Sequence, residues 1–208
     1  MAKESKYHIE NNRILFYETF LDEQSVRKLN NGVPNGYVNF TQGVAHFTED
    51  DAPSYGSINY GQHYTHPMDL TGDITVMMYI RPDNYGLGCA DTCKILTNGE
   101  FTIGLYGGAN EYVFATSDET DYVETATSSI VLDEWVNIIM TRTSAGVANF
   151  YLDGVLNGDS DQDSGVPDSP DDDLVVVHTD FPFIGDIDYI TIYNRLLSVP
   201  EIENINCV

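Results

Sequence analysis

The segment DSDQDSGVPDSPDDD, residues 159–173, holds seven aspartates and no lysine or arginine. Carboxylates at alternate positions, here Asp159, Asp161 and Asp163, are typical of loops that bind Ca²⁺. An EF-hand loop would need glycine at its sixth position and glutamate at its twelfth, where this chain has serine and proline. The segment is therefore either a solvated acidic loop or a calcium site of another type, with these three aspartates as the ligands.

Asp188 is a second candidate because of its place in the run IDYITIYN. Side chains along a strand alternate between its two faces, so Asp188 is in phase with Ile190 and Ile192. If the two isoleucines face the core, the carboxylate faces it too. A buried charge must be paired, hydrogen-bonded or bound to a metal.

Tyrosines gather in the segment SYGSINYGQHYTH, residues 54–66. A flat phenol ring with a polar tip suits stacking on sugar rings and adhesive contacts. We therefore predict a ligand site at Tyr55, Tyr60 and Tyr64; the alternative is that these rings only cover the edge of a sheet. The two histidines of the segment lack a third metal ligand, which favours surface hydrogen bonding.

The charge of the chain restricts its partners. Its 208 residues include 9 basic and 33 acidic side chains, a formal net charge of −24. This charge repels nucleic-acid phosphates and anionic membranes, while divalent cations accumulate around it. We therefore expect no nucleic-acid partner. Because no stretch approaches about eighteen apolar residues, we also expect no membrane insertion.

The first thirteen residues contain basic side chains but no apolar core of about seven residues, so they do not form a secretory signal peptide. We interpret residues 1–13 as an N-terminal extension and residues 14–208 as one domain. Cys89, Cys93 and Cys207 match no zinc-site spacing. Either Cys89 and Cys93 form a local disulfide in an oxidising setting, or all three are ordinary thiols.

The elements that must position these residues are strands, because the dominant hydrophobic period is two. In ITVMMYIR, residues 74–81, the apolar residues Ile74, Val76, Met78 and Ile80 share one face, as in a strand with one buried side. Similar runs begin at Ile14, Gly43, Phe101, Tyr112, Trp135, Val147 and Ile187. Short strands at this spacing predict two packed antiparallel sheets.

Two local signals are more specific. Asp153 and Gly154 in YLDGVL predict a two-residue hairpin, since both central positions of a type I′ turn need a positive φ. In SVPEIENI, Ser198 and Glu201 form a capping box and Pro200 stands in the first turn. This pattern predicts a short C-terminal helix.

With these elements in order, the chain resembles a laminin-G-like domain of the concanavalin A-like lectin/glucanase superfamily. The resemblance rests on the segments GVAHFT, LTGDITVMMYIRPDN, DEWVNIIMTRTSAGVANFYLDGVLNG and FIGDIDYITIYNRLLSVPEI. It runs from Ile14 to Ile205 and implies an all-β jelly-roll sandwich of two antiparallel sheets, with ligand sites on the concave face or its rim. Trp135 matches a tryptophan that opens a core strand in such domains, and we expect it to be a packing residue.

The resemblance also bears on the carboxylates. Asp188 matches an aspartate with which several relatives hold a structural calcium, so calcium is one expectation there and a hydrogen-bond anchor the other. Hydrolases of the superfamily carry carboxylates on one strand, about 5 to 5.5 Å apart in retaining enzymes. The segment ETDYVE offers Glu119, Asp121 and Glu124 for this role. However, Thr120 stands where an apolar residue is usual, and non-catalytic relatives have a variable loop here, so we expect no enzyme.

Three functions follow, in order of preference. The first is a non-catalytic recognition module that binds a glycan or another surface polymer on the concave sheet or its rim. The second is a structural, decoration or adhesion protein on the exterior of a phage or other virion, in contact with a shell protein. The third is a glycoside hydrolase. The first two place the chain in the extracellular space or on a virion surface.

Overall fold

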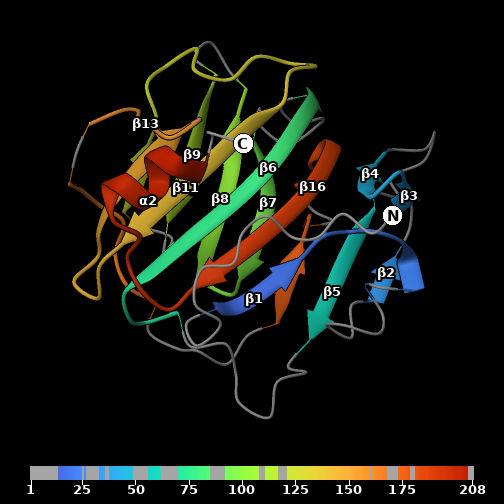
Figure 1. Cartoon of the computed structure of the whole chain (residues 1–208), viewed down its shortest axis with the longest axis horizontal. Coiled ribbons are helices and arrows are strands. Elements are labelled where there is room, and N and C mark those ends of the chain that lie inside the picture. Colours follow the sequence, from blue (N-terminus) through green and yellow to red (C-terminus); the bar gives the residue numbers. More distant parts are fainter. Residues whose placement is uncertain are drawn as a thin grey trace.

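The computed structural model of the chain describes residues 14–24, 26, 33–35, 38–48, 56–61, 70–84, 92–107, 111–116, 121–159, 161–167, 173–178 and 181–205. The strands in these ranges form two antiparallel sheets that pack face to face, and the helix α2 (Val199–Ile205) lies on the outer side of one of them (Figure 1). The predicted all-β, two-sheet sandwich with a short C-terminal helix is confirmed.

One sheet has nine strands among the described residues. Along its main path the order is β13 (Val155–Leu156), β12 (Val147–Leu152), β11 (Val136–Arg142), β6 (Ile74–Asn84), β16 (Ile184–Tyr193), β4 (Val44–Phe47) and β3 (Val38–Thr41). Two further strands are β1 (Ile14–Glu18), which pairs with β16, and β14 (Gln162–Asp163), which pairs with β12. In Figure 1 the long strands β6 and β16 run side by side through its middle.

The other sheet has seven strands in the described part of the chain. Their order is β10 (Tyr122–Glu124), β9 (Tyr112–Thr116), β8 (Phe101–Tyr106), β7 (Thr92–Asn98), β15 (Leu174–Val176), β5 (Ser57–Gly61) and β2 (Val33–Asn35). The strands β7 to β10 follow one another in the chain and in space, so a short stretch of sequence supplies four adjacent strands of one surface.

The main hydrophobic core lies between the two sheets. The four residues predicted to share one face of β6, Ile74, Val76, Met78 and Ile80, are all buried in it. Met77 points to the opposite face of the strand and is buried in a second cluster, together with the isoleucines of α2. Full burial of such a side chain contributes about 1.5–3 kcal/mol. The first half of β6 is thus buried on both faces, whereas the alternation in the sequence predicts one buried face.

The predicted hairpin is confirmed. Tyr151 pairs with Leu156 across β12 and β13, and the turn between them is formed by Asp153 and Gly154, with φ of 48° and 78°. The Asp153 carboxylate accepts a hydrogen bond of 2.9 Å from the backbone N–H of Asn137 on β11. The turn is therefore anchored to the next strand of the sheet.

The predicted capping box is also confirmed. The backbone N–H of Ser198 donates to the Glu201 carboxylate at 2.8 Å, as a capping box requires. Arg195 donates to both carboxylate oxygens of Glu201, at 3.0 and 2.7 Å. The hydrogen bonds from Arg195 are the main reason why the pKa of Glu201 is lowered to about 2. The helix start is thus held by two residues that precede it.

Strand β16 departs from regular alternation at Asp188. Its register on β6 passes from Ile187 opposite Ile80 to Tyr189 opposite Tyr79, so Asp188 is the extra residue of a β-bulge. Ile190 and Ile192 do face the core, and the bulge interrupts the regular alternation between them and Asp188. The side chain of Asp188 is half-buried. That it shares their face stays a prediction.

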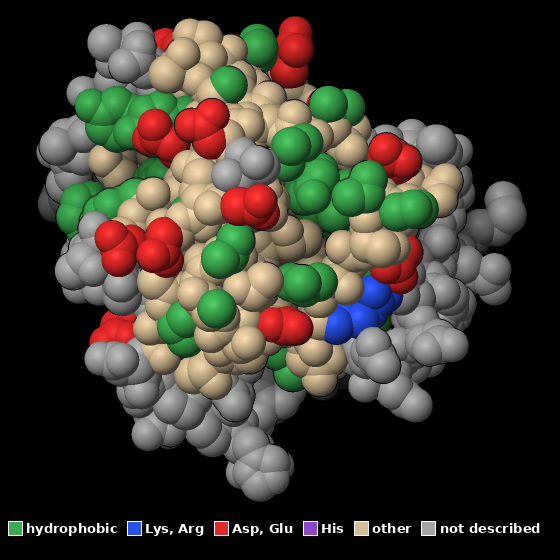
Figure 2. Space-filling model, turned by 90° about the vertical axis from the view of Figure 1, so that its left-hand side faces the viewer, with side chains coloured by type: hydrophobic (Ala, Val, Ile, Leu, Met, Phe, Trp, Pro, Cys, Tyr) green, Lys and Arg blue, Asp and Glu red, His purple; other side chains and the backbone are tan. Residues whose placement is uncertain are grey.

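The acidic excess is visible on the surface. On the face shown in Figure 2, acidic side chains are spread among hydrophobic and polar ones, whereas the basic side chains of the described residues are confined to one small area. This distribution agrees with the net charge of −24. In the described part of the chain, no helix has the length and apolar character needed to cross a membrane.

Candidate functional site

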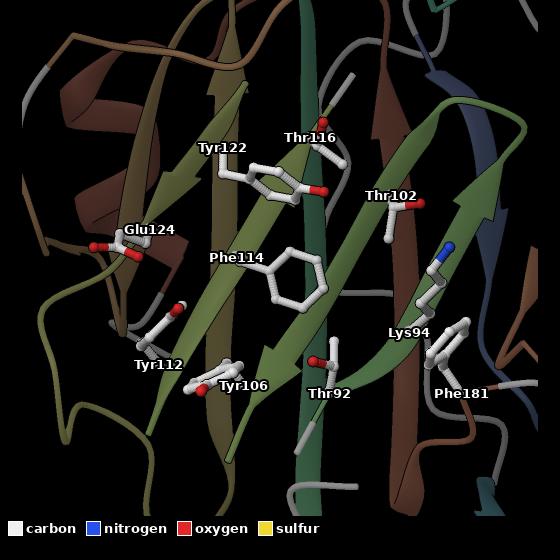
Figure 3. Close-up of a pocket in the computed structure, with 10 residues that line it drawn as sticks. All are labelled: Thr92, Lys94, Thr102, Tyr106, Tyr112, Phe114, Thr116, Tyr122, Glu124 and Phe181. Carbon is white, nitrogen blue, oxygen red and sulfur yellow. The ribbon is translucent and has the colours of Figure 1, made fainter. Parts of the chain in front are cut away.

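The outer face of the seven-stranded sheet carries a groove of about 550 Å³ (Figure 3). Its floor and walls are side chains of β7, β8, β9 and β10, and one end is closed by Phe181. The lining residues are Thr92, Lys94, Thr102, Tyr106, Tyr112, Phe114, Thr116, Tyr122, Glu124 and Phe181. A surface of aromatic rings with a few polar groups is typical of small-molecule and glycan sites.

Strand pairing arranges these side chains in three rows, because residues opposite each other on neighbouring strands point to the same face. The first row is Thr92, Tyr106 and Tyr112; the second is Lys94, Gly104, Phe114 and Glu124; the third is Thr102, Thr116 and Tyr122. The residues between them along the strands belong to the main core. The groove is thus the outward half of four alternating strands.

Four aromatic rings form the centre of the groove. The rings of Tyr106 and Tyr112 are stacked, with centroids 4.9 Å apart and an angle of 23° between their planes. The rings of Phe114 and Tyr122 are tilted, 6.2 Å apart. Tyr122 is 56% exposed, so much of its ring is open to a ligand. Rings fixed by each other in this way offer flat apolar area at little entropic cost.

Gly104 makes room for this arrangement. A Cβ at position 104 would lie 2.8 Å from two carbons of the Phe114 ring and 2.0 Å from the backbone oxygen of Cys93. The ring of Phe114 therefore lies directly over the glycine.

Cys93 itself is buried on the core side of β7 as a free thiol, and burial raises its pKa to about 12. This favours ordinary thiols over a disulfide; Cys89 and Cys207 lie outside the described residues.

The two ends of the groove carry opposite charges. At one end the Lys94 ammonium lies 5.2 Å from the centre of the Phe181 ring. At the other end Glu124 stands beside Tyr112. Burial, the charge of Glu124 and a hydrogen bond between the two side chains raise the pKa of Tyr112. The phenol of Tyr112 therefore stays protonated and can donate a hydrogen bond.

Thr102 is the most deeply placed polar residue of the groove. It is 1% exposed, and its hydroxyl has no hydrogen-bond partner among the described residues. Figure 3 shows its side chain on the groove side of β8, with the oxygen directed toward β7. A buried hydroxyl without a partner costs about 1–3 kcal/mol. A ligand that reaches it would recover this cost.

The structure does not place the side chains of the three tyrosines that the sequence predicts as a ligand site. Tyr55 and Tyr64 are outside the described residues; Tyr60 lies in β5, but the position of its side chain is not described. The ligand site predicted there stays a prediction. The groove tyrosines were missed as a group because they come from three strands. Their signal was the alternation of aromatic residues and threonine within FTIGLY and YVFAT.

The acidic segment is structured at its start. Asp161 accepts a hydrogen bond from the side chain of Asn149, and Asp163 accepts one from the N–H of Gly165. Between the two aspartates, Gln162 exchanges hydrogen bonds with the backbone of Glu124 and so joins the edges of the two sheets.

Asp159 is exposed, and residues 168–172 lie outside the described ranges. Within those ranges, no three His, Cys, Asp or Glu side chains are placed to hold a metal. Calcium at Asp188 would therefore need backbone carbonyls as its other ligands, as the resemblance implies. The calcium sites at Asp188 and in the acidic segment stay predictions.

A buried carboxylate that the sequence did not single out is Asp186. It is 3% exposed, forms an ion pair with Arg81 on β6 and contacts Nδ1 of His46 on β4. The Arg81 Nε donates to Asp186 at 2.8 Å, and this bond raises the pKa of Arg81. The cluster joins three strands of the nine-stranded sheet. Asp186 thus has the paired environment that a buried carboxylate requires and that the sequence analysis expected at Asp188.

The segment ETDYVE does not assemble a carboxylate pair among its described residues. Glu124 lines the groove with Tyr122, while Val123 between them faces the core. Asp121 precedes β10 in the phase of Val123, opposite to that of Glu124. Glu119 lies outside the described residues. Of the described residues that line the groove, Glu124 is the sole carboxylate.

Comparison with known proteins agrees with this architecture. Residues 55–203 match the family model described as the concanavalin A-like lectin/glucanases superfamily. A comparison with curated protein sequences gives no significant match.

Among solved structures, domain 4 of AbnA, an extracellular arabinanase from Geobacillus stearothermophilus in complex with arabinotriose, is similar over 93% of this chain and 98% of that one, with a TM-score of 0.62 and 15% identity. The binding domain of botulinum neurotoxin DC, in complex with rat synaptotagmin II, is similar over 85% of this chain and 46% of that one, with a TM-score of 0.62 and 13% identity. This chain thus spans about half the length of the neurotoxin domain. At these identities the likeness shows the fold.

Proposed function

The chain belongs to the concanavalin A-like lectin/glucanase superfamily, and from this premise we propose that it is a non-catalytic recognition module that binds a glycan in the groove on the seven-stranded sheet. The observation that carries the proposal is the combination, in one groove, of five aromatic rings with three threonine side chains. The apolar faces of sugar rings stack on aromatic rings, and their hydroxyls exchange hydrogen bonds with polar side chains.

The similar structures support this proposal. One similar structure is an arabinanase domain in complex with arabinotriose, and another is the neurotoxin DC binding domain in complex with SialylT, with a TM-score of 0.60 and 14% identity. A non-catalytic role is supported by the lining of the groove, since glycoside hydrolysis uses two carboxylates and the described lining has one. Hydrolysis, virion decoration and an extracellular location stay predictions from the sequence.

The proposal is tested on immobilised polysaccharides and glycans. We expect the purified chain to be retained by at least one of them, and Tyr122→Ala to weaken this retention about tenfold, because an exposed stacking ring is lost with little effect on the fold. The matched control is Tyr17→Ala, because Tyr17 lies on β1 of the opposite sheet. Absence of retention on every glycan, or equal retention of both variants and the natural chain, would overturn the proposal.

A further inference from the structure

The groove has a basic end, and we propose that this end is an anion subsite that selects glycans carrying a carboxylate or a sulfate ester. The subsite consists of Lys94, Thr102 and Phe181. This inference rests on the proposed function, since it assumes that a glycan occupies the groove. It adds the chemical class of that glycan.

Lys94 shares a second hollow with Glu100 and Asp173 but forms no ion pair with either of them. Its backbone N–H donates to the carbonyl of Phe181 at 2.8 Å, and its carbonyl accepts from the N–H of His178 at 3.3 Å. Its ammonium lies over the Phe181 ring and forms no ion pair with any described carboxylate. In a chain with 33 acidic and 9 basic residues, a lysine of this kind is available to a ligand.

Thr102 supplies a second donor at the same end. In Figure 3 the Lys94 side chain extends along β7 in the direction of Thr102, whose oxygen is directed toward β7. The Thr102 hydroxyl is buried and has no partner in the described part of the chain. An anionic oxygen placed here would accept the hydroxyl proton and neutralise the ammonium. Both groups would then be satisfied by one substituent.

Because of Glu124, the end of the groove opposite Lys94 carries a negative charge. Lys94 and Glu124 belong to the same row, with Gly104 and Phe114 between them. Three strand spacings separate them, about 14 Å, so one anionic group cannot contact both. Glu124 repels an anion from its end, and the acidic surface repels densely charged polymers. We therefore expect a glycan with sparse anionic groups, one of them at Lys94 and neutral rings on the tyrosines.

The experiment compares matched polymers on the full chain. Soluble galactan, arabinan, β-glucan and mannan are each tested in the neutral form, after partial oxidation of primary hydroxyls to carboxylates, and after light sulfation. Affinity electrophoresis and calorimetry give the dissociation constants. We expect an anionic form to bind about tenfold more tightly than its neutral parent, the size of one charge-assisted hydrogen bond. The two anionic arms separate a carboxylate from a sulfate ligand.

Variants assign the preference to the subsite. Lys94→Gln should bring the dissociation constants of each neutral polymer and its anionic form to the same value, whatever its effect on binding as a whole. Lys94→Arg should restore most of the preference for the anionic form, and Thr102→Val should reduce it. Equal binding of neutral and anionic forms by the natural chain, or an undiminished preference in Lys94→Gln, overturns the subsite and leaves glycan binding in place. Failure of every form to bind overturns glycan binding in the groove and the subsite with it.

Discussion

The outer faces of the two sheets carry similar residues with different surroundings. On the nine-stranded sheet, the ring of Tyr79 is stacked between Trp135, 4.8 Å away, and Tyr189, 5.9 Å away, and neighbouring residues are covered by α2. Trp135 is half-buried, and its stack on Tyr79 agrees with the expectation that it is a packing residue. On the seven-stranded sheet, Tyr112 and Tyr122 line an open groove. An aromatic cluster on a sheet is therefore part of the packing where other elements cover it, and it is available for binding where they do not.

The largest expected effect separates the two faces directly. Tyr193, 1% exposed under α2, packs in the covered cluster, so Tyr193→Ala should lower the free energy of unfolding by about 3 kcal/mol or more. Tyr122→Ala on the open face should change it by about 0.5 kcal/mol or less. Urea denaturation of both variants measures the difference. Equal losses would mean that the groove tyrosines also serve mainly to pack.

Gly104→Ala should produce the next largest effect. The added methyl would meet the backbone oxygen of Cys93 and the ring of Phe114, so we expect a loss of about 2–3 kcal/mol and a displaced aromatic floor. Gly72→Ala is the matched control, because nothing lies within 4 Å of a Cβ at that position. Denaturation curves and glycan retention are measured together. A Gly104→Ala chain with unchanged stability would contradict the close approach of Phe114.

The third prediction concerns calcium binding at Asp188, on strand β16 of the nine-stranded sheet. If Asp188 helps to hold the ion, calcium at about tenfold excess over its Kd should stabilise the folded chain by about 1.4 kcal/mol, since the ion binds the folded state alone. Thermal melts in calcium and in chelator measure this difference, and Asp188→Asn should remove it. A calcium effect that Asp159→Asn removes and Asp188→Asn does not would place the ion in the acidic segment instead of at Asp188. Identical melting temperatures in calcium and chelator would exclude both sites.

The smallest effect concerns the helix that covers the nine-stranded sheet. Glu201→Gln should cost about 1 kcal/mol at neutral pH, through its bonds to Arg195 and Ser198. Because the folded pKa of about 2 lies below the ordinary value of 4.5, this contribution is complete above about pH 4.5 and is lost as the pH falls toward 2. Urea denaturation at several pH values should show the two chains converging. The exposed Glu134→Gln serves as control, and a gap that persists at low pH would contradict the ionic origin.

Local patterns in the sequence suffice to predict the sandwich and several of its details. Alternation of two placed the β6 residues in the core, Asp153 and Gly154 specified the hairpin turn, and Ser198 with Glu201 specified the helix start. These features depend on residues close together in the chain. Short-range sterics and hydrogen bonding therefore suffice to predict them.

The groove and the buried charges depend on contacts between distant parts of the chain. The rows of the groove join residues of four strands. Whether the ring of Tyr112 is open or covered depends on which sheet α2 packs against, and no local sequence pattern predicts this. The bulge at Asp188 arises from how β16 pairs with β6, and the burial of Asp186 depends on Arg81 and His46 from the two neighbouring strands. The pairing register between distant segments is set by the packing of the whole sandwich. The alternation of residues along one strand therefore cannot predict that register.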